Sequence, residues 1–214
     1  MTPTAAGRPT PRTLRVTVAG LVVASVCTVG TLVHQSASSA APPSSEAPRA
    51  GDRGGGTADP DGAPTEEDGV LPHGVTVFDD EHPGVAELDP ELHEALREAT
   101  TDAAHDGIEI HVNSGWRSRE YQDELVREAV ARYGSEEEAA RWVASADTSA
   151  HVSGDAVDIG DADATAWLAD RGAGYGLCRV YRNEPWHYEL RPAAVDRGCP
   201  PMYADPTEDP RMRP

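Results

Sequence analysis

The chain has 214 residues and a formal net charge of −19, with 20 glycines and 18 prolines. This length suits one modest domain with extensions better than two full domains, and the glycine and proline content indicates that part of the chain is not packed. The acidic balance argues against nucleic-acid binding, because contacts with a phosphate backbone need clustered lysine and arginine.

The first 34 residues have the pattern of an export segment. Three arginines precede an uncharged run at 16–33, and small residues follow, with a cleavage position after Ala40. The run is long for a cleaved signal peptide, and at roughly 18 residues it could also span a bilayer as an uncleaved anchor. Both alternatives keep the arginines on the cytoplasmic side. We therefore expect the rest of the chain to be secreted, or anchored on the cell-wall side of the membrane.

A change in composition separates this segment from the folded part of the chain. Residues 35–72 are rich in proline, glycine, serine and acidic residues and offer almost nothing to bury. We interpret them as a disordered linker that carries the domain away from the membrane or through wall material. The sequence predicts a single folded domain at 73–205 and a C-terminal tail at 206–214.

The domain is expected to begin with a helix followed by a strand. Asp89 can cap a helix that has Pro90 at its first position and ends at Gly107. Apolar residues then alternate over 108–112, which is the period of a half-buried strand.

Two further helices are predicted after this strand. The range 118–133 has helical character, and a capping box formed by Ser135 and Glu138 opens a short helix that runs to Trp142.

The last third of the domain predicts one more helix and a β-hairpin. A short helix is expected over 163–171, followed by β-rich runs at 177–181 and 186–190 with a turn between them. Helices that come first and a small antiparallel sheet that comes later predict an α+β domain with a small core.

The three cysteines fit an exported protein. Cys27 lies in the export segment, which leaves Cys178 and Cys199 as a pair in an oxidising environment. We expect a disulfide between them, and closing a loop of about 20 residues would contribute roughly 3 kcal/mol. The alternative is a pair of free thiols. Metal binding by these cysteines is disfavoured because no CxxC spacing is present.

Three side chains, those of His151, Asp158 and His187, are candidate metal ligands. Histidine nitrogen and carboxylate oxygen suit Zn²⁺, and three protein ligands leave a fourth position open, as in catalytic sites. A turn at Gly154 followed by a strand over 156–159 would bring His151 and Asp158 together, with Asp158 pointing away from the core. Taken singly, each residue is more often an ordinary surface or core residue than a ligand.

Two charged residues complete a possible catalytic set. Glu184 stands three residues before His187, where a carboxylate can act as general base and then as general acid. Arg117 lies between a predicted strand and a predicted helix, where it could bind a substrate carbonyl oxygen and stabilise an oxyanion. The alternatives are an exposed turn acid and a surface arginine paired with one of the many acids.

The order of these residues resembles the zinc D,D-peptidases, which comprise VanY-type D-alanyl-D-alanine carboxypeptidases and VanX-type dipeptidases. The resemblance covers roughly residues 75–190, and only the cysteines near its end depart from the pattern. The family's S-x-H-x-x-G-x-A-x-D pattern is matched at Ser149, His151, Gly154, Ala156 and Asp158. Its E-x-W-H element stands at 184–187, and its G-[WY]-R-S element stands at 115–118, with Gln122 following in the next helix.

This resemblance implies a mixed α+β fold and one bound Zn²⁺. The implied zinc ligands are His151, Asp158 and His187. Glu184 would be the catalytic base, and Arg117 would anchor the scissile carbonyl group. Ser149 and Gln122 would contact the substrate peptide.

The implied activity is that of a zinc carboxypeptidase that removes the terminal D-Ala from peptidoglycan stem peptides. Together with the export segment, this predicts an exported enzyme, which we expect to be a monomer. Alternatives are a related peptidase with another bond specificity: an L-Ala-D-Glu endopeptidase, an L,D-carboxypeptidase or a D,D-dipeptidase. A non-catalytic, metal-stabilised wall-binding module is less favoured, because both Glu184 and Arg117 are present. A serine D,D-peptidase is disfavoured because the S-x-x-K, S-x-N and K-T-G set is missing.

Overall fold

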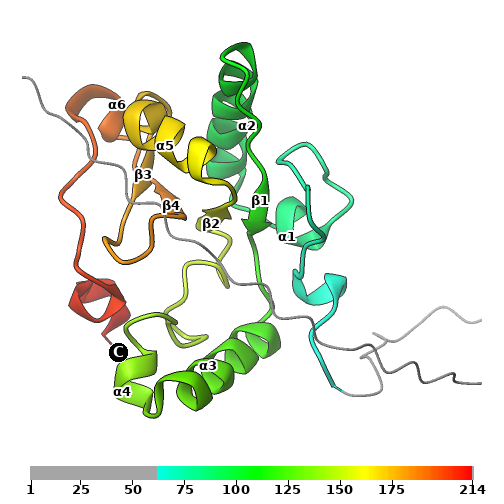
Figure 1. The fold of residues 1–214 in the computed structure, drawn as a ribbon, viewed down its shortest axis with the longest axis vertical. Helices are drawn as coiled ribbons and strands as arrows, with labels where there is room; N and C mark the ends of the chain where they lie inside the picture. The colour runs from blue at the N-terminus through cyan, green and yellow to red at the C-terminus, as the bar shows by residue number, and fades with distance from the viewer. Residues whose placement is uncertain (1–61, 214) are drawn as a thin grey trace, which may run out of the picture. The chain divides into compact units, whose positions relative to one another are not determined.

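Four short strands form an antiparallel sheet at the centre of the domain (Figure 1). The computed structural model describes residues 62–213. The strands are β1 (Val112–Ser114), β2 (Ala156–Ile159), β3 (Leu177–Arg179) and β4 (His187–Leu190). Their order in the sheet is β1-β2-β4-β3, and each neighbouring pair is antiparallel. Together with the surrounding helices, this sheet confirms the predicted α+β class.

Helices α2 and α5 pack on one face of the sheet, and α3 and α4 lie apart from them (Figure 1). The α-helices are α1 (Pro83–Ala86), α2 (Pro90–His105), α3 (Arg119–Tyr133), α4 (Glu136–Ala139), α5 (Ala162–Arg171) and α6 (Ala194–Arg197). The 3₁₀ helices are η1 (Glu66–Asp68), η2 (Gly172–Tyr175), η3 (Pro206–Glu208) and η4 (Pro210–Met212). Within the described residues, no helix is long and apolar enough to cross a membrane.

The hydrophobic core lies between the sheet and helices α2 and α5. Leu92 of α2 and Leu168 of α5 are buried there. Val157 and Ile159 of β2 join the same core, because alternate residues of a strand face the same side. Asp158 stands between them and therefore projects from the opposite face, as the sequence predicted.

Helices α2 and α3 begin at the predicted residues because side chains cap them. The Asp89 carboxylate accepts hydrogen bonds from the N–H groups of Glu91 and Leu92. The Ser118 hydroxyl accepts one from the N–H of Tyr121. These bonds satisfy backbone donors that have no partner within the first turn of a helix.

The strand expected at 108–112 lies closer to the C-terminus than predicted. β1 pairs with β2 only from Val112 to Ser114, and the last bond at this end runs from the Gly160 N–H to the His111 carbonyl. Beyond Gly160 the chain turns into α5, so β2 ends before it could pair with 108–110. Ile110 is still buried in the core. The alternation therefore indicated burial rather than strand pairing.

The other predicted elements are present, and α4, β3 and β4 are shorter than predicted. Ser135 caps α4 by accepting a hydrogen bond from Glu138, but the helix ends at Ala139 rather than at Trp142. The expected hairpin is formed by β3 and β4, which pair in antiparallel register.

Packed structure extends beyond both ends of the range 73–205. The Asp68 carboxylate and carbonyl accept hydrogen bonds from Ser118, at 2.9 and 2.8 Å. Residues 65–71 therefore belong to the domain and not to the predicted linker. At the other end Pro206 and Asp209 are buried, so the predicted tail is also part of the packed domain. The predicted export segment and the first part of the linker lie outside the described residues.

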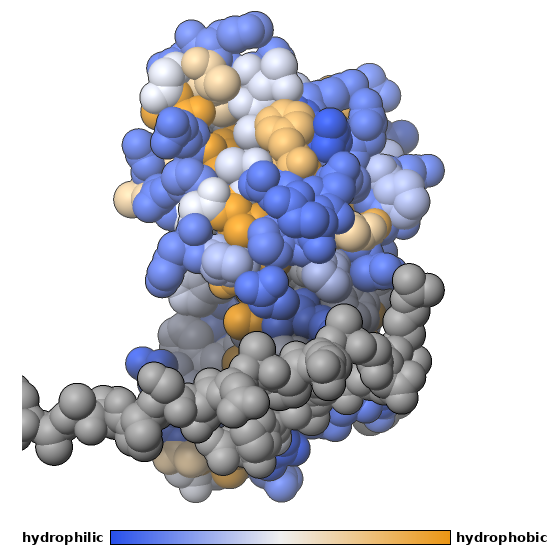
Figure 2. All heavy atoms as spheres, turned by 90° about the vertical axis from the view of Figure 1, so that its right-hand side faces the viewer, coloured by the Kyte–Doolittle hydropathy of each residue, from blue (hydrophilic) through white to orange (hydrophobic). Residues whose placement is uncertain are grey.

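The predicted disulfide joins Cys178 of β3 to Cys199, with an S–S distance of 2.00 Å. It fastens the segment after α6 to the edge strand of the sheet. The face shown in Figure 2 carries mostly hydrophilic residues, with hydrophobic residues scattered among them.

Candidate metal-binding and catalytic site

The register of β2 against β4 brings two of the predicted ligands together. Asp158 is the direct cross-strand partner of His187, so both side chains project from the face opposite the core. His151 reaches the same place from the turn that precedes β2. Gly154 makes that turn with a φ of +79°, and its carbonyl accepts a hydrogen bond from the Asp89 N–H.

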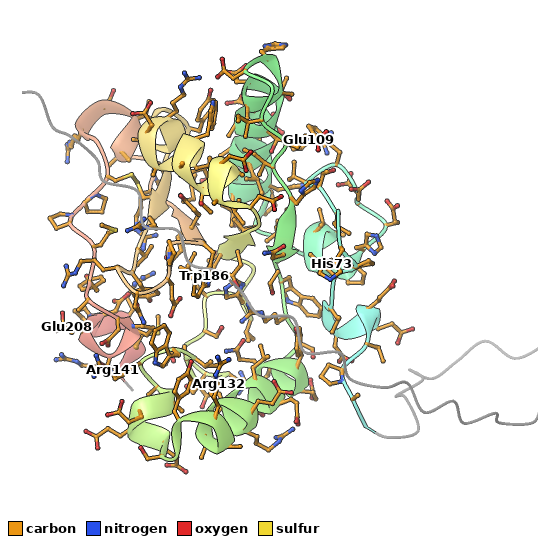
Figure 3. The ribbon with its side chains drawn as sticks, in the orientation of Figure 1. His73, Glu109, Arg132, Arg141, Trp186 and Glu208 are labelled. Carbon is orange, nitrogen blue, oxygen red and sulfur yellow. A yellow bond between two sulfur atoms is a disulfide. The ribbon has the colours of Figure 1, made fainter. Side chains whose placement is uncertain are left out.

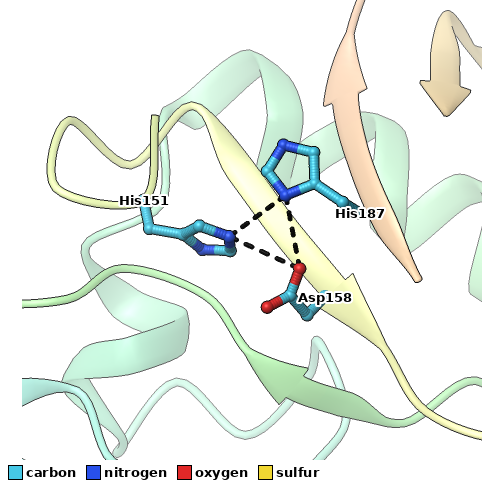
Figure 4. Close-up of side chains that lie close together, drawn as sticks. All are labelled: His151, Asp158 and His187. Atoms are coloured by element: carbon cyan, nitrogen blue, oxygen red, sulfur yellow. Dashed lines mark hydrogen bonds and ion pairs between the residues drawn. The ribbon is translucent and has the colours of Figure 1, made fainter. Parts of the chain in front are cut away.

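The three side chains converge closely (Figure 4). The His151 Nε2 lies 3.3 Å from the His187 Nδ1 and 3.4 Å from the Asp158 Oδ1. The His187 Nδ1 lies 3.3 Å from the same oxygen. Both histidines are 5% exposed, so this cluster is almost removed from solvent. The structure thus unites the three residues that the sequence predicted as ligands.

Each histidine ring has an inner nitrogen, which faces the cluster, and an outer nitrogen, which points away from it. The partners of the outer nitrogens show which nitrogen of each neutral ring carries the proton. The His151 Nδ1 lies 2.8 Å from the Gly115 carbonyl, and the His187 Nε2 lies 3.2 Å from the Glu189 Oε1. Because both partners are acceptors, these nitrogens carry the protons of the neutral rings. The inner nitrogens then face each other and the Asp158 Oδ1 as three acceptors. A cation satisfies such a set, so the residues fit a metal ion.

A proton and a metal ion compete for the inner nitrogen of His187, and the ionisation of these groups shows that the cluster attracts positive charge. Burial and the nearby Arg117 charge lower the pKa of His151. Burial opposes ionisation of Asp158, but His151, His187 and Arg117 outweigh it and hold the pKa of this carboxyl well below its usual range. Burial also disfavours the charged form of His187, yet hydrogen bonds to Asp158 and Glu189 raise its pKa to about 9. The pocket therefore favours positive charge between the ligands.

Glu184 lies beside the ligands, in the loop between β3 and β4. It is 6% exposed, and its Oε2 is 3.9 Å from the His187 Nδ1. Its other oxygen, Oε1, is buried without a hydrogen-bond partner among the described residues. Burial raises the pKa of this carboxyl to about 7, against the opposing effect of His187. A carboxylate with such a pKa can both accept and return a proton near neutral pH.

Arg117 is held at the edge of the cluster by three hydrogen bonds. Its guanidinium donates to the Ser114 hydroxyl at 2.7 Å, to the Gln122 Oε1 at 3.2 Å and to the Asp158 Oδ2 at 2.7 Å. The Gln122 amide also donates to the Ala144 carbonyl at 2.8 Å. Gln122 is 1% exposed and uses both ends of its amide. The structure therefore gives Gln122 a role in positioning Arg117, and because the same side chain lines the adjoining cavity, its contact with substrate stays a prediction.

A cavity of about 210 Å³ opens over these residues, between the sheet and the α3–α4 region. Ser149 lines it, as predicted, together with the ligands, Glu184 and Arg117. Its remaining wall is largely apolar and includes Trp142, Pro206 and Met212. Trp186, also in the lining, is 40% exposed and is labelled in Figure 3. The cavity thus combines a polar floor with apolar sides.

Comparison with known proteins gives the family of the chain. Residues 85–193 match the model of the VanY family, described as D-alanyl-D-alanine carboxypeptidase. The match covers just over half of the chain and includes every predicted ligand and catalytic residue. The chain belongs to the VanY family. The predicted resemblance is therefore confirmed.

A curated VanY-family relative is the D-alanyl-D-alanine carboxypeptidase of Enterococcus faecalis (strain ATCC 700802 / V583). It is 33% identical over 127 residues, which cover 47% of each chain. The chain thus spans about half the length of this relative.

Solved structures are also similar to this VanY-family chain. A mutant of the vancomycin resistance D,D-pentapeptidase VanY from a VanB-type cassette, in complex with Zn(II), is 30% identical, with a TM-score of 0.46 over 48% of this chain and 72% of that chain. VanYB in complex with D-alanine-D-alanine is 29% identical, with a TM-score of 0.48 over 52% and 74%. The LdcB LD-carboxypeptidase is 25% identical, with a TM-score of 0.48 over 62% and 72%.

The sequence analysis did not identify two charged residues behind the VanY-family site. Glu189 contacts His187 from the side opposite the cavity, and Arg211 contacts Glu189. Glu189 could have been found, because residues two apart in a strand share a face. Arg211 lies beyond the family match and belongs to no sequence motif that would indicate a role.

Proposed function

We propose that this protein is a zinc D,D-carboxypeptidase that removes the terminal D-Ala from peptidoglycan stem peptides. The observation that carries the proposal is the buried cluster of three acceptors, with Glu184 and Arg117 beside it in one cavity. Membership of the VanY family supports this reaction, and the Zn(II) complex of a similar structure supports the choice of metal.

In this proposal His151, Asp158 and His187 would hold the metal ion. Their two imidazole nitrogens and one carboxylate oxygen are a donor set that suits Zn²⁺. When bound, Zn²⁺ would supply Lewis acidity, which polarises a carbonyl group and lowers the pKa of water toward about 7. The other steps depend on residues of the chain.

Glu184 would move the proton during hydrolysis. Its carboxylate would accept a proton from the attacking water and then pass it to the amine of the leaving D-alanine. Its raised pKa suits both transfers, because a group titrating near the working pH can accept and release a proton.

Arg117 would bind the oxygen of the scissile carbonyl and stabilise the negative charge that develops on it. Its three hydrogen bonds fix the guanidinium before substrate arrives, so little reorganisation is needed during the reaction. Ser149 would contact the peptide from the cavity wall. The apolar part of the wall would accept the small methyl groups of the D-Ala residues.

We further propose that the enzyme acts as an exported monomer on the outer side of the cytoplasmic membrane. The arginine-flanked apolar run at 16–33 supports export, and the assembled cell wall that carries the proposed substrate lies outside that membrane. Membrane contact would then involve only the N-terminal segment.

The test is product analysis by mass spectrometry after incubation with muropeptides of defined stem length. The purified protein is expected to remove one D-Ala from pentapeptide stems, to stop when the metal is chelated, and to recover when Zn²⁺ is restored. Shortening of tetrapeptide stems would instead show an L,D-carboxypeptidase, and cleavage between L-Ala and D-Glu would show an endopeptidase. Hydrolysis of free D-Ala-D-Ala, with the stems left intact, would show a dipeptidase. Binding without cleavage would favour a wall-binding module.

A further inference from the structure

The C-terminal segment, Cys199–Arg213, forms part of the cavity although it lies beyond the family match, which ends at residue 193. Pro206 and Met212 of this segment line the cavity opposite the ligands. The C-terminal segment is therefore more than a tail beside the catalytic domain.

Covalent and backbone bonds fasten this segment to the sheet. The Cys178–Cys199 disulfide ties its start to β3. The Tyr203 N–H then donates to the Val180 carbonyl at 3.0 Å, and the Arg182 N–H donates to the Tyr203 carbonyl at 3.0 Å. These bonds extend the edge of the sheet by one parallel bridge.

The same segment also reaches the α3–α4 side of the cavity. The Arg141 guanidinium lies 3.2 Å from the carboxylate of Asp205, which is 5% exposed. The Asn183 side chain donates to the Arg141 carbonyl at 2.8 Å, which links the β3–β4 loop to the same point. The segment thus bridges the two sides of the site.

Arg211 connects this segment to the metal-binding cluster. Its guanidinium donates to both oxygens of Glu189, at 2.6 and 3.2 Å, in a bidentate pair. The Asp209 carboxylate, which is fully buried, holds the same guanidinium and also accepts a hydrogen bond from the Tyr181 hydroxyl at 3.1 Å. The centroid of the Tyr181 ring in turn lies 5.2 Å from the centroid of the His187 ring.

Glu189 links Arg211 to His187, one of the proposed metal ligands. It is 1% exposed, and its Oε1 lies 3.2 Å from the His187 Nε2. Arg191 donates to its other oxygen at 2.6 Å. A carboxylate behind a ligating histidine fixes the orientation and tautomer of the ring. A buried carboxylate of this kind must itself be neutralised and oriented, which Arg211 does from both oxygens.

We propose that the C-terminal segment forms an integral part of the active site and that Arg211 is a positioning residue, which orients His187 through Glu189. This inference rests on the proposed function, because it concerns the affinity of the cluster for Zn²⁺. A guanidinium fits the role because its planar fork matches both carboxylate oxygens, which an ammonium group cannot do.

The test compares Arg211→Met, Arg211→Lys and the matched control Arg213→Met in the full chain. Arg213 is exposed two residues away, and its side chain makes no hydrogen bond within the described residues. The Zn²⁺ dissociation constant is measured by competition with a chromophoric chelator, beside kcat and KM. Arg211→Met is expected to weaken Zn²⁺ binding by about 10- to 100-fold, as loss of a ligand's outer partner typically does. Arg211→Lys is expected to lose less, and Arg213→Met is expected to match the wild type.

Equal Zn²⁺ affinity in wild type and both Arg211 variants would overturn the proposal, as would an equal loss in the Arg213 control. If Arg211→Met fails to fold, Arg211→Lys decides the question: weaker binding supports the positioning role, and unchanged binding refutes it. A wild-type protein that binds no Zn²⁺ would refute the proposed function and this inference together. A wild type that binds and turns over normally, beside unaffected Arg211 variants, would refute this inference alone.

Discussion

Glu184 occupies a site in which burial and charge act in opposite directions on one carboxyl group. Removal from water raises its pKa to about 7, while the positive charge of His187 acts to lower it. A metal ion held by the neighbouring ligands would add to the second effect. The working pKa of Glu184 in a loaded enzyme is thus expected at or below about 7, where its base form predominates at neutral pH.

This balance predicts the dependence of activity on pH. Because only ionised Glu184 can accept a proton, kcat/KM should be constant above its pKa and fall about tenfold per pH unit below it. The profile is measured with zinc-loaded enzyme on a pentapeptide stem. Glu184→Gln should keep the metal but lose most turnover, and its residual rate should lack this limb. A shared pH profile for wild type and Glu184→Gln would exclude Glu184 as the base.

Gln122 illustrates how a buried amide can serve the site by holding a neighbouring side chain. It accepts from Arg117 and donates to the Ala144 carbonyl. Gln122→Met keeps the approximate volume but leaves a buried carbonyl without its donor, so unfolding measured with urea should require about 1–3 kcal/mol less. The freed Arg117 should also bind the carbonyl of the substrate less well, which lowers kcat/KM. Wild-type stability together with wild-type kcat/KM would contradict this role.

The order and spacing of residue types were sufficient to predict the metal ligands. They were insufficient to predict the residues that hold those ligands in place. His151, Asp158 and His187 belong to motifs whose spacing is fixed by one turn and one strand pair. The partner of Glu189 instead comes from Arg211, 22 residues further on, through a loop whose path no periodicity predicts. Such ion pairs depend on the folded arrangement, so sequence alone could not show them.

Among the elements, the turn before β2 is tightly constrained at its glycine. At Gly154 a Cβ atom would lie 2.5 Å from the Glu87 carbonyl oxygen and 3.0 Å from the Asp89 nitrogen. Both neighbours are backbone atoms, which cannot move aside as a flexible side chain could. The positive φ of +79° adds strain for any residue with a side chain.

Substitution of two glycines can separate the clash from the strain. Gly107 has a similar φ of +77°, but no other atom of the described residues lies within 4 Å of its Cβ position. Gly107→Ala should therefore destabilise the protein by about 1 kcal/mol, and Gly154→Ala by at least about 2 kcal/mol more. Urea unfolding measures both values. Only Gly154→Ala should also weaken Zn²⁺ binding, because it displaces His151. Equal destabilisation by the two substitutions would argue against the close approach.

At the scale of elements, capping and periodicity predicted the helices better than the strands. Asp89 and Ser118 cap α2 and α3 through local contacts, which a sequence reader can recognise. β1 depends instead on where β2 ends, and β2 ends where Gly160 turns the chain into α5. The bounds of a strand are set by a partner that is distant in the sequence. For this reason β1 lies closer to the C-terminus than the strand predicted at 108–112.

In the whole molecule, two layers meet at the site and the C-terminal segment holds them together. The sheet contributes Asp158 and His187 from the face opposite the hydrophobic core. The α3–α4 region contributes the opposite wall, and Arg141 joins it to Asp205. The packing of residues 65–71 and 206–212 was missed because the first stretch is rich in acids and the second in proline and acids. That composition is typical of linkers, yet their few contacts are specific.

Metal binding should stabilise the whole domain, because its ligands come from the turn before β2, from β2 and from β4. Without a cation the fold brings three acceptors together, so a ligand that binds only the folded state stabilises it by mass action. Adding Zn²⁺ at about 100 times its dissociation constant to chelated protein should raise the free energy of unfolding by about 2.7 kcal/mol. Mg²⁺ should have little effect, since it prefers oxygen ligands.

Two histidine variants separate this effect from unspecific metal binding. His151→Ala removes a ligand and should abolish most of the Zn²⁺-dependent stabilisation measured by urea unfolding. His105→Ala changes an exposed histidine at the end of α2 and should retain it fully. If Zn²⁺ stabilised His151→Ala as much as the wild type, the metal would bind elsewhere, and the cluster would lose its assignment. The ligands span the sheet and the turn before β2, so the gain should appear as one cooperative unfolding transition at higher urea.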